Sequence, residues 1–299
     1  MIIKREQFIW DFYKNGKGKI CDSFDHVSYN ENIFSNNSRL SRQILPRVVY
    51  VSLFPGYLNA SLFKSENYKL KKIKHNGFSG AGIRLDGYDS ADSYLKILKK
   101  NDLRKIIKKK RARLYKDYSV KLEHNFGSIT EEKCSYLLKT LHEMISVRFV
   151  DKLEEHSFLS DWDSNIKNMV SLINNKKTSL FVVYADEKPI SIQVNRHIYG
   201  VLLFCETHSF DMNYRKYGMG NFNYYLNIDW AAKNNITFMD FGNGISYIKK
   251  KWANMFYDTH YLIFRKKNNF IALIISYFEI IKIKLKTLIK YCRFYFNKL

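Results

Sequence analysis

The sequence has few of the residues that break or cross-link a chain. Its 299 residues include only 3 prolines and 13 glycines, which argues against long disordered linkers and low-complexity tracts. The four cysteines, Cys21, Cys134, Cys205 and Cys292, are far apart and form neither a C-x-x-C motif nor a histidine-paired ligand spacing. We therefore expect free thiols, a reducing compartment and no metal site.

The N-terminus also lacks the features of an export signal. Residues 1–19, MIIKREQFIWDFYKNGKGK, contain no apolar core segment and no small-residue cleavage site. The uncharged run at 268–277 is too short to cross a bilayer, which takes about 20 apolar residues. These absences predict a cytoplasmic protein.

Acidic residues are scarce relative to basic ones. Lysine and arginine number 50 against 28 aspartates and glutamates, so the net charge is +22 and the pI is about 9.6. Such a charge favours an anionic partner: CoA phosphates, a nucleotide-sugar, RNA or an acidic lipid surface. A lysine-rich surface that reflects the codon usage of an AT-rich genome is the alternative. The 46% hydrophobic content suffices for one large domain or two modest ones.

The best-defined motif is a glycine loop between an apolar strand and a helix. It reads Arg215-Lys216-Tyr217-Gly218-Met219-Gly220, or R-x-x-G-x-G. Glycines allow backbone N–H groups to converge, and the start of a helix adds partial positive charge, so such a loop can bind a pyrophosphate. The spacing differs from the Rossmann G-x-G-x-x-G and from the Walker G-K-[ST] ending.

The elements around this loop follow a regular order. Residues 89–118 predict one or two basic helices, 120–124 a short strand, and 130–149 and 161–174 two helices. Three successive strands separated by turns follow between 178 and 211, and the loop, a helix and a strand at 236–241 complete the set. We therefore predict an α+β fold with a mixed central sheet flanked by helices.

The predicted basic helical region carries a cluster of cations that either binds phosphates or is simply a solvated face. The cluster comprises Arg104, Lys105, Lys108, Lys109, Lys110, Arg111 and Arg113.

Several stretches resemble the GNAT acyltransferase superfamily, in particular its CelD/BcsL-like branch. They are the basic run at 94–118, DMNYRKYGMG at 211–220, and MDFGNGISYIKKKWAN at 239–254, which is similar to a D-F-G-x-G … K-x-x-W-x-N ending. The related Fem-type aminoacyl transferases carry a similar lysine-rich segment. The resemblance implies a GNAT fold with a degenerate second GNAT-like half at the N-terminus. It suggests segments 1–118, 119–267 and 268–299, the second being catalytic.

The resemblance also implies roles for residues of the loop and the strand before it. The acyl donor would be acetyl-CoA or another acyl-CoA. Its pyrophosphate would bind at Arg215, Lys216, Tyr217, Gly218, Met219 and Gly220. A main-chain N–H near Phe210 would bond the thioester carbonyl. At the end of the last strand, Asp240, Gly242 and Gly244 either shape the substrate cleft or simply form a turn.

Acyl transfer to an amine needs a proton acceptor and stabilisation of the leaving thiolate, and neither a metal nor a covalent nucleophile. Glu206 and His208, two apart in a strand, are the candidate bases, with Glu206 favoured. Alternatively, Glu206 forms an ion pair with a lysine or arginine, and His208 is simply a hydrogen-bonded residue of the strand. Tyr247 and Lys249 are candidates for the thiolate or an anionic acceptor, although Ile248 stands where the family has a tyrosine before the lysine. Cys205 is expected to be a buried thiol.

The C-terminal residues 268–299 predict a basic amphipathic helix. It either lies on an anionic membrane surface or packs on the N-terminal half of the chain. The leading hypothesis is an acyl-CoA-dependent N-acyltransferase acting on an amine, such as an amino-sugar of a cell-surface polysaccharide precursor or another small or lipid-linked acceptor. The alternatives are Fem-type transfer from aminoacyl-tRNA to a peptidoglycan precursor, and a non-catalytic basic binding module.

Overall fold

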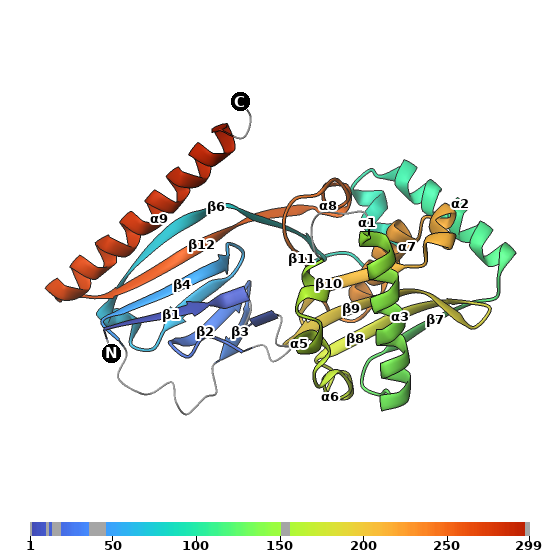
Figure 1. Ribbon diagram of the computed structural model, residues 1–299, viewed down its shortest axis with the longest axis horizontal. Helices are drawn as coiled ribbons and strands as arrows, with labels where there is room; N and C mark the ends of the chain where they lie inside the picture. Colours follow the sequence, from blue (N-terminus) through green and yellow to red (C-terminus); the bar gives the residue numbers. More distant parts are fainter. Residues whose placement is uncertain (1, 10–11, 14–18, 36–45, 151–155, 297–299) are drawn as a thin grey trace. The chain divides into compact units, whose positions relative to one another are not determined.

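The computed structural model describes residues 2–9, 12–13, 19–35, 46–150 and 156–296, apart from the side chains of residues 157 and 290–296. The chain forms two compact units (Figure 1). Unit 1 comprises Met1–Phe12, Lys19–Gly80 and Phe256–Leu299, and unit 2 comprises Tyr13–Gly18 and Ala81–Met255. The boundaries of these units differ from those of the predicted segments 1–118, 119–267 and 268–299.

Unit 2 contains the glycine loop and the elements predicted around it. They are α1 (Ala91–Ile97), α2 (Asn101–Asp117), β7 (Val120–Asn125), α3 (Glu131–Phe149), α4 (Ser157–Ser160), α5 (Trp162–Ile166), α6 (Met169–Asn174), β8 (Thr178–Ala185), β9 (Lys188–Ile198), β10 (Leu202–Phe210), the 3₁₀ helix η4 (Met212–Tyr217), α7 (Met219–Lys233), β11 (Phe238–Asn243) and α8 (Tyr247–Trp252).

The predicted element order is confirmed with one correction. Two capping residues explain where helices begin: Ser90 accepts the N–H of Ser93 at the start of α1, and Thr130 accepts that of Lys133 at the start of α3. The single helix predicted over 161–174 is wrong, because α5 ends at Ile166 and α6 begins at Met169. Asn168, between them, has a left-handed backbone (φ 60°) that no α-helix can continue through.

The sheet of unit 2 is mixed. Its strand order is β11-β10-β9-β8-β7, with the end of β6 (Tyr68–Arg84) on the outer side of β11. Strands β7, β8, β9 and β10 pair with one another in antiparallel fashion, and β10 and β11 are parallel. This arrangement confirms the predicted α+β class.

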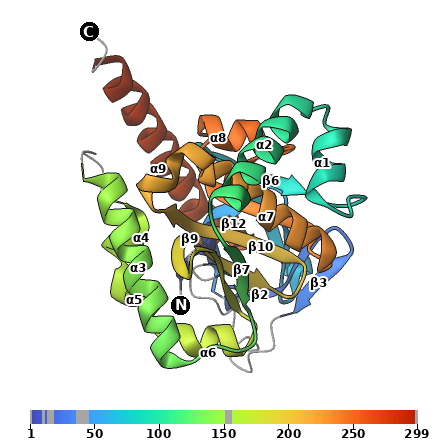
Figure 2. The same ribbon diagram turned by 90° about the vertical axis from the view of Figure 1, so that its right-hand side faces the viewer.

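Helices cover both faces of this sheet (Figure 2). On one face α3 and α6 pack against apolar residues of β8 and β9 such as Leu180, Val182 and Ile192. On the other face α2 and α7 pack against the alternate residues, such as Val183 and Ile190. Strands β8 and β9 are therefore buried on both faces, on one against α3 and on the other against α7.

Unit 1 combines segments from both ends of the chain. Its strands are β1 (Ile3–Gln7), β2 (Phe24–Tyr29), β3 (Asn32–Ser35), β4 (Val48–Pro55), β5 (Asn59–Leu62), the first part of β6, and β12 (Met255–Lys266), with η3 (Ser65–Asn67) between β5 and β6. Four of these strands lie side by side in the order β1-β4-β12-β6. The other three form a separate sheet in the order β3-β2-β5. The predicted degenerate GNAT-like repeat in this region stays a prediction.

The last element of unit 1 is the long helix α9 (Phe270–Phe296), which confirms the predicted C-terminal helix. It packs through Ala272 and Ile283 against Val48 of β4 and Ile263 of β12. Within the part of the chain that is described, no helix has the length and apolar character needed to span a bilayer.

The buried His197 and the half-buried His124 of unit 2 predict an acid-sensitive fold. His197 Nε2 and Ser179 Oγ form a hydrogen bond of 2.8 Å. The imidazole ring stacks on the Phe126 ring, with centroids 4.2 Å apart. Burial, with a smaller contribution from His124, lowers the pKa of His197 to about 3, and burial lowers that of His124 to about 4. Histidines in the unfolded chain have pKa values near 6.5. Between the folded-state pKa values and this one, the unfolded chain therefore binds more protons than the folded chain.

The free energy of unfolding should therefore fall as the pH drops from about 7 towards 4, by about 1.4 kcal/mol per pH unit for His197 alone once it titrates in the unfolded chain. Urea unfolding at several pH values measures the slope. His197→Gln should reduce it, and an identical slope in both proteins would contradict this prediction.

Candidate acyl-transfer site

Strand β10 is irregular where it leaves β11. The two strands pair at Leu202, Leu203 and Phe204, and the pairing ends there although both strands continue. Just beyond, the register with β9 shifts between Cys205 and Thr207, so Glu206 is the extra residue of a β-bulge. A bulge bends its strand and increases the local twist. This bend explains why β10 and β11 separate and leave an open edge on β10.

The glycine loop lies just beyond the end of this strand. Gly218 adopts a left-handed conformation (φ 69°) and is the N-cap of α7, with no side chain capping the helix. The first N–H groups of a helix have no acceptor within the helix, so those of Met219 and Gly220 point out of its N-terminus. Gly220 has an ordinary backbone angle, and a Cβ there would have only the Phe210 ring nearby, at 3.9 Å. The fold therefore requires glycine at 218 but not at 220.

Helix α2 brings positive charge to the loop. A Cβ on Gly218 would lie 2.7 Å from Cδ and 3.5 Å from Nζ of Lys110. The hydroxyl of Tyr217 donates to Asp117 of α2 at 2.7 Å, which ties η4 to this helix. Arg215 and Lys216 are exposed beside it. Lys110, a member of the predicted basic cluster, thus joins the six predicted loop residues, and only the tertiary contact reveals which member does so.

Glu206, the favoured candidate base, is engaged in a buried ion pair. Its Oε2 lies 2.5 Å from Nε of Arg196, and the two side chains are 3% and 1% exposed. Arg196 also donates to Thr178 Oγ1 at 2.9 Å and to the carbonyl of Asn165 at 3.1 Å. The structure therefore favours the alternative interpretation of Glu206: the carboxylate neutralises a buried guanidinium on the α3 side of the sheet.

His208 lies on the part of β10 that has separated from β11. Its ring meets the edge of Tyr224 from α7, with centroids 5.6 Å apart. Burial, with smaller contributions from Arg148 and His156, lowers the pKa of His208 to about 4. The imidazole is therefore neutral at pH 7, with a lone pair that can accept a proton.

Lys249 closes the end of β11. Its ammonium donates to the carbonyls of Gly242 and Asn243 at 3.2 and 2.7 Å. Burial lowers the pKa of Lys249, although Asp240 and Cys205 act in the opposite direction. Asp240, only 2% exposed, accepts the N–H of Gly242 at 2.7 Å. Lys249 and Asp240 thus form one compact turn at the carboxyl end of β11.

The other predicted residues of this turn lie at its surface. Gly242 and Gly244 have left-handed backbones, with φ of 71° and 85°. A Cβ at Gly242 would meet the Phe204 ring at 3.2 Å, whereas Gly244 faces open space. Tyr247 is 83% exposed and does not join the Lys249–Asp240 turn. The substrate roles of Asp240, Gly242 and Gly244 stay predictions.

Arg148 of α3 is a residue that sequence reasoning missed. Its Nη1 donates to the backbone carbonyl of His208 and to Ser209 Oγ, both at 3.4 Å, and its guanidinium lies 4.7 Å from the centroid of the Phe210 ring. Backbone groups of residues two apart in a strand point to the same side, so the Phe210 N–H shares the edge of the His208 carbonyl. Arg148 therefore lies where the predicted thioester carbonyl would bind.

A cavity of about 310 Å³ adjoins this point on the α3 face. Its lining includes Glu143, Met144, Val147, Phe210, Asp211 and Met212. The volume is at the lower end of that of ligand pockets. Glu143 in the wall suits a cationic group such as an ammonium, whereas the charge of Asp211 is balanced by Lys188, which lines the same cavity and lies 2.7 Å from it.

Cys134 and Cys205 are free thiols, as predicted, and the side chain of Cys292 lies outside the described residues. Burial raises the pKa of the Cys205 thiol, which opposes a nucleophilic role. Among the described residues, no group of three or more His, Cys, Asp or Glu side chains is arranged to hold a metal ion.

The element order and the glycine loop are those that the GNAT resemblance predicts. Residues 101–250 match the family model Acetyltransf_6, an acetyltransferase (GNAT) domain. The chain belongs to this GNAT family. It is accordingly an acyltransferase, and the resemblance stated from the sequence motifs is confirmed.

Solved structures similar to the chain share little sequence with it. L-PGS from Bacillus licheniformis is 13% identical over 76% of this chain and 71% of that one, with a TM-score of 0.46. The C-terminal domain of a putative lysylphosphatidylglycerol synthetase from Agrobacterium fabrum is 12% identical over 77% and 71%, with a TM-score of 0.47. FemX is 10% identical over 73% and 72%, with a TM-score of 0.48. No curated protein sequence matches the chain.

Proposed function

We propose that the protein transfers an acyl group from acyl-CoA to an amine. The observation that carries this proposal is the N-terminus of α7, where the first backbone N–H groups of the helix follow Gly218 beside Lys110, Arg215 and Lys216. A helix N-terminus with added cations is suited to a pyrophosphate. The acyl-pantetheine arm then runs along the open edge of β10, where the Phe210 N–H bonds the thioester carbonyl.

Among the four catalytic candidates, the geometry supports His208 best as proton acceptor. It is neutral at pH 7 and lies on the separated part of β10, next to the carbonyl position at Phe210. Glu206 is engaged by Arg196, and Tyr247 is exposed. Lys249, a cation at the end of β11, is the candidate for stabilising the leaving thiolate or an anionic acceptor.

The acceptor is an amine that enters from the α3 face. The cavity beside Phe210 supports this side, because the Glu143 carboxylate in its wall attracts an ammonium before its deprotonation. An amino-sugar of a cell-surface polysaccharide precursor is the acceptor class suggested by the motif resemblance. A small-molecule and a lipid-linked form both satisfy this chemistry.

Acyl transfer is tested by following release of the CoA thiol with a chromogenic disulfide, using acetyl-CoA or longer acyl-CoAs and a panel of amino-sugars. Amine-dependent release is expected. His208→Gln should lower kcat by about 10²-fold, because general-base catalysis contributes about 10²–10⁴-fold. Absence of release with every acyl-CoA would refute the proposal, and unchanged kcat in His208→Gln would exclude its role as base.

One observation favours a second candidate, transfer from aminoacyl-tRNA. Helix α2 exposes Lys105, Lys108, Lys109, Arg111 and Arg113 on the same helix that touches the loop. Such a row suits a long polyanion. This candidate predicts tRNA binding whose affinity falls steeply with salt, and absence of tRNA binding at low salt would exclude it.

A further inference from the structure

Helix α9 is buried on a side made mostly of small and polar residues. Ala272, Ser276, Glu279 and Ile283 are at most 6% exposed and face unit 1. Glu279 pairs with Arg5 of β1 at 2.7 Å, which fixes the helix on the sheet. At about 100° per residue, these four positions occupy one narrow side of the helix.

The opposite side of α9 is apolar and exposed. A helix that packs on a sheet usually turns its apolar side inward and its polar side to water. Here the outward residues are large and hydrophobic, with exposed fractions of 58% for Tyr277, 60% for Phe278, 50% for Ile281, 51% for Leu285 and 59% for Leu288. Continuous exposed apolar surface of this kind marks an interaction site.

Lysines flank this apolar stripe on both sides. Lys284 lies on one flank, and Lys282 and Lys286 lie on the other, where they border a second groove next to β1 and β4. In an interfacial helix, basic residues at this position reach lipid phosphates while the apolar side enters the acyl boundary.

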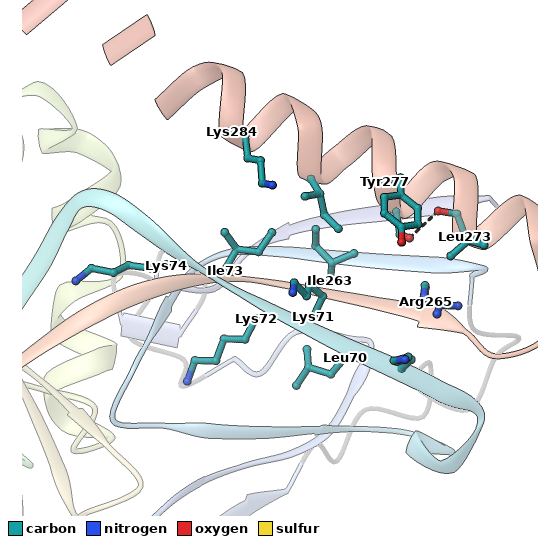
Figure 3. Close-up of a pocket in the computed structure, with 13 residues that line it drawn as sticks. Leu70, Lys71, Lys72, Ile73, Lys74, Ile263, Arg265, Leu273, Tyr277 and Lys284 are labelled. Carbon is teal, nitrogen blue, oxygen red and sulfur yellow. Dashed lines mark hydrogen bonds between the residues drawn. The ribbon is translucent and has the colours of Figure 1, made fainter. Parts of the chain in front are cut away.

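The groove beneath Lys284 adds a lining of cations (Figure 3). Its volume is about 610 Å³, and β6 contributes Lys69, Lys71, Lys72 and Lys74 to its lining. Aliphatic residues, including Ile73, Ile263 and Leu273, line it as well, and its described lining holds no carboxylate. Cations above an aliphatic wall suit a molecule that is both anionic and apolar.

We propose that unit 1 binds the surface of an anionic phospholipid membrane, with the apolar side of α9 in the interface and the lysines of α9 and β6 on lipid phosphates. A second copy of the chain would bring like charges together on a protein of net charge +22. A nucleic acid would use the lysines but leave the apolar stripe in water. An anionic membrane contacts both the lysines, through its phosphates, and the apolar stripe, through its acyl chains.

Co-sedimentation of the full chain with vesicles tests the proposal. Binding is expected to vesicles of phosphatidylcholine with about 30% phosphatidylglycerol, to be at least tenfold weaker on pure phosphatidylcholine, and to weaken when NaCl is raised from about 0.1 to 0.5 M. Equal binding to both vesicle types, or none to either, would overturn it.

Variants identify the surface. Ile281→Asp/Leu285→Asp should reduce binding at least tenfold, and Lys282→Glu/Lys284→Glu should reduce binding to anionic vesicles. Ile97→Asp, at an apolar position on α1 that is slightly more exposed (59%), is the matched control and should bind normally. Circular dichroism and thermal midpoints check that the variants fold.

Retention of vesicle binding by the α9 variants would contradict the proposal. So would an effect of these variants on dimerisation, seen by analytical ultracentrifugation, or on binding of a homopolymeric RNA, with vesicle binding unchanged. Because no readout involves turnover, failure of this proposal and failure of the acyl-transfer proposal are distinguishable.

Discussion

Gly220→Glu should weaken acyl-CoA binding by about 100-fold or more and leave the fold intact. Position 220 has an ordinary backbone angle, and a Cβ there would have only the Phe210 ring within 4 Å, so a Cβ fits without strain. Its carboxylate would stand among the N–H groups at the start of α7, where we expect the pyrophosphate. Repulsion between like charges costs several kcal/mol, and each 1.4 kcal/mol is about tenfold in affinity.

Two alanine variants separate ligand binding from folding. Gly220→Ala should raise the free energy of unfolding by up to about 1 kcal/mol, because alanine is the better helix former. Gly218→Ala should lower it, because the left-handed backbone is strained for alanine and its Cβ would lie 2.7 Å from Lys110 Cδ. Urea unfolding and donor titration measure both properties. Full acyl-CoA affinity in Gly220→Glu would mean that the pyrophosphate binds elsewhere.

Arg196→Met should destabilise unit 2 by about 3–5 kcal/mol. The substitution leaves the Glu206 carboxylate buried without its guanidinium partner, and an uncompensated buried charge carries this cost. The double variant Arg196→Met/Glu206→Leu removes both charges and should recover much of the lost stability. Urea unfolding measures the three free energies, and absence of recovery would show that the two groups are not energetically coupled.

The same pair distinguishes a structural Glu206 from a catalytic one. Glu206→Gln should lower stability while changing kcat by no more than about threefold, whereas loss of a general base lowers kcat by about 10²–10⁴-fold. A fall of that size in folded Glu206→Gln would restore Glu206 as the base and displace His208.

The elements around the loop were predictable because their signals are local. Strands β8, β9 and β10 are apolar runs separated by turns, and Ser90 and Thr130 are helix caps that can be read directly from the sequence. The break at Asn168 was not predictable, because asparagine tolerates both helical and left-handed backbone and its neighbours continue the helical pattern.

The site residues depended on tertiary contacts that no local pattern contains. Glu206 and His208 are two apart in the sequence, which in a regular strand would put both on one face. The bulge at Glu206 changes this relation, and it directs Glu206 to Arg196 of β9. Similarly, Arg148 lies on a helix some 60 residues before His208, and only the packing of α3 brings it to the His208 carbonyl.

Helix α9 shows the same limit in another form. Its periodicity predicts an amphipathic helix, and the usual rule would bury the larger apolar residues. The structure instead buries Ala272 and Ser276 against the sheet and exposes Phe278 and Leu285. Small residues permit close approach to the strands, so the choice of buried side depends on the shape of the partner surface.

The central claim is that the start of α7 binds the pyrophosphate of CoA. Isothermal titration of the wild-type protein with CoA tests it most directly. The comparison ligand is pantetheine, which lacks the pyrophosphate. We predict saturable 1:1 binding of CoA that weakens with salt and is lost in Gly220→Glu, with much weaker binding of pantetheine. Absence of CoA binding, or equal binding of CoA and pantetheine, would contradict the claim.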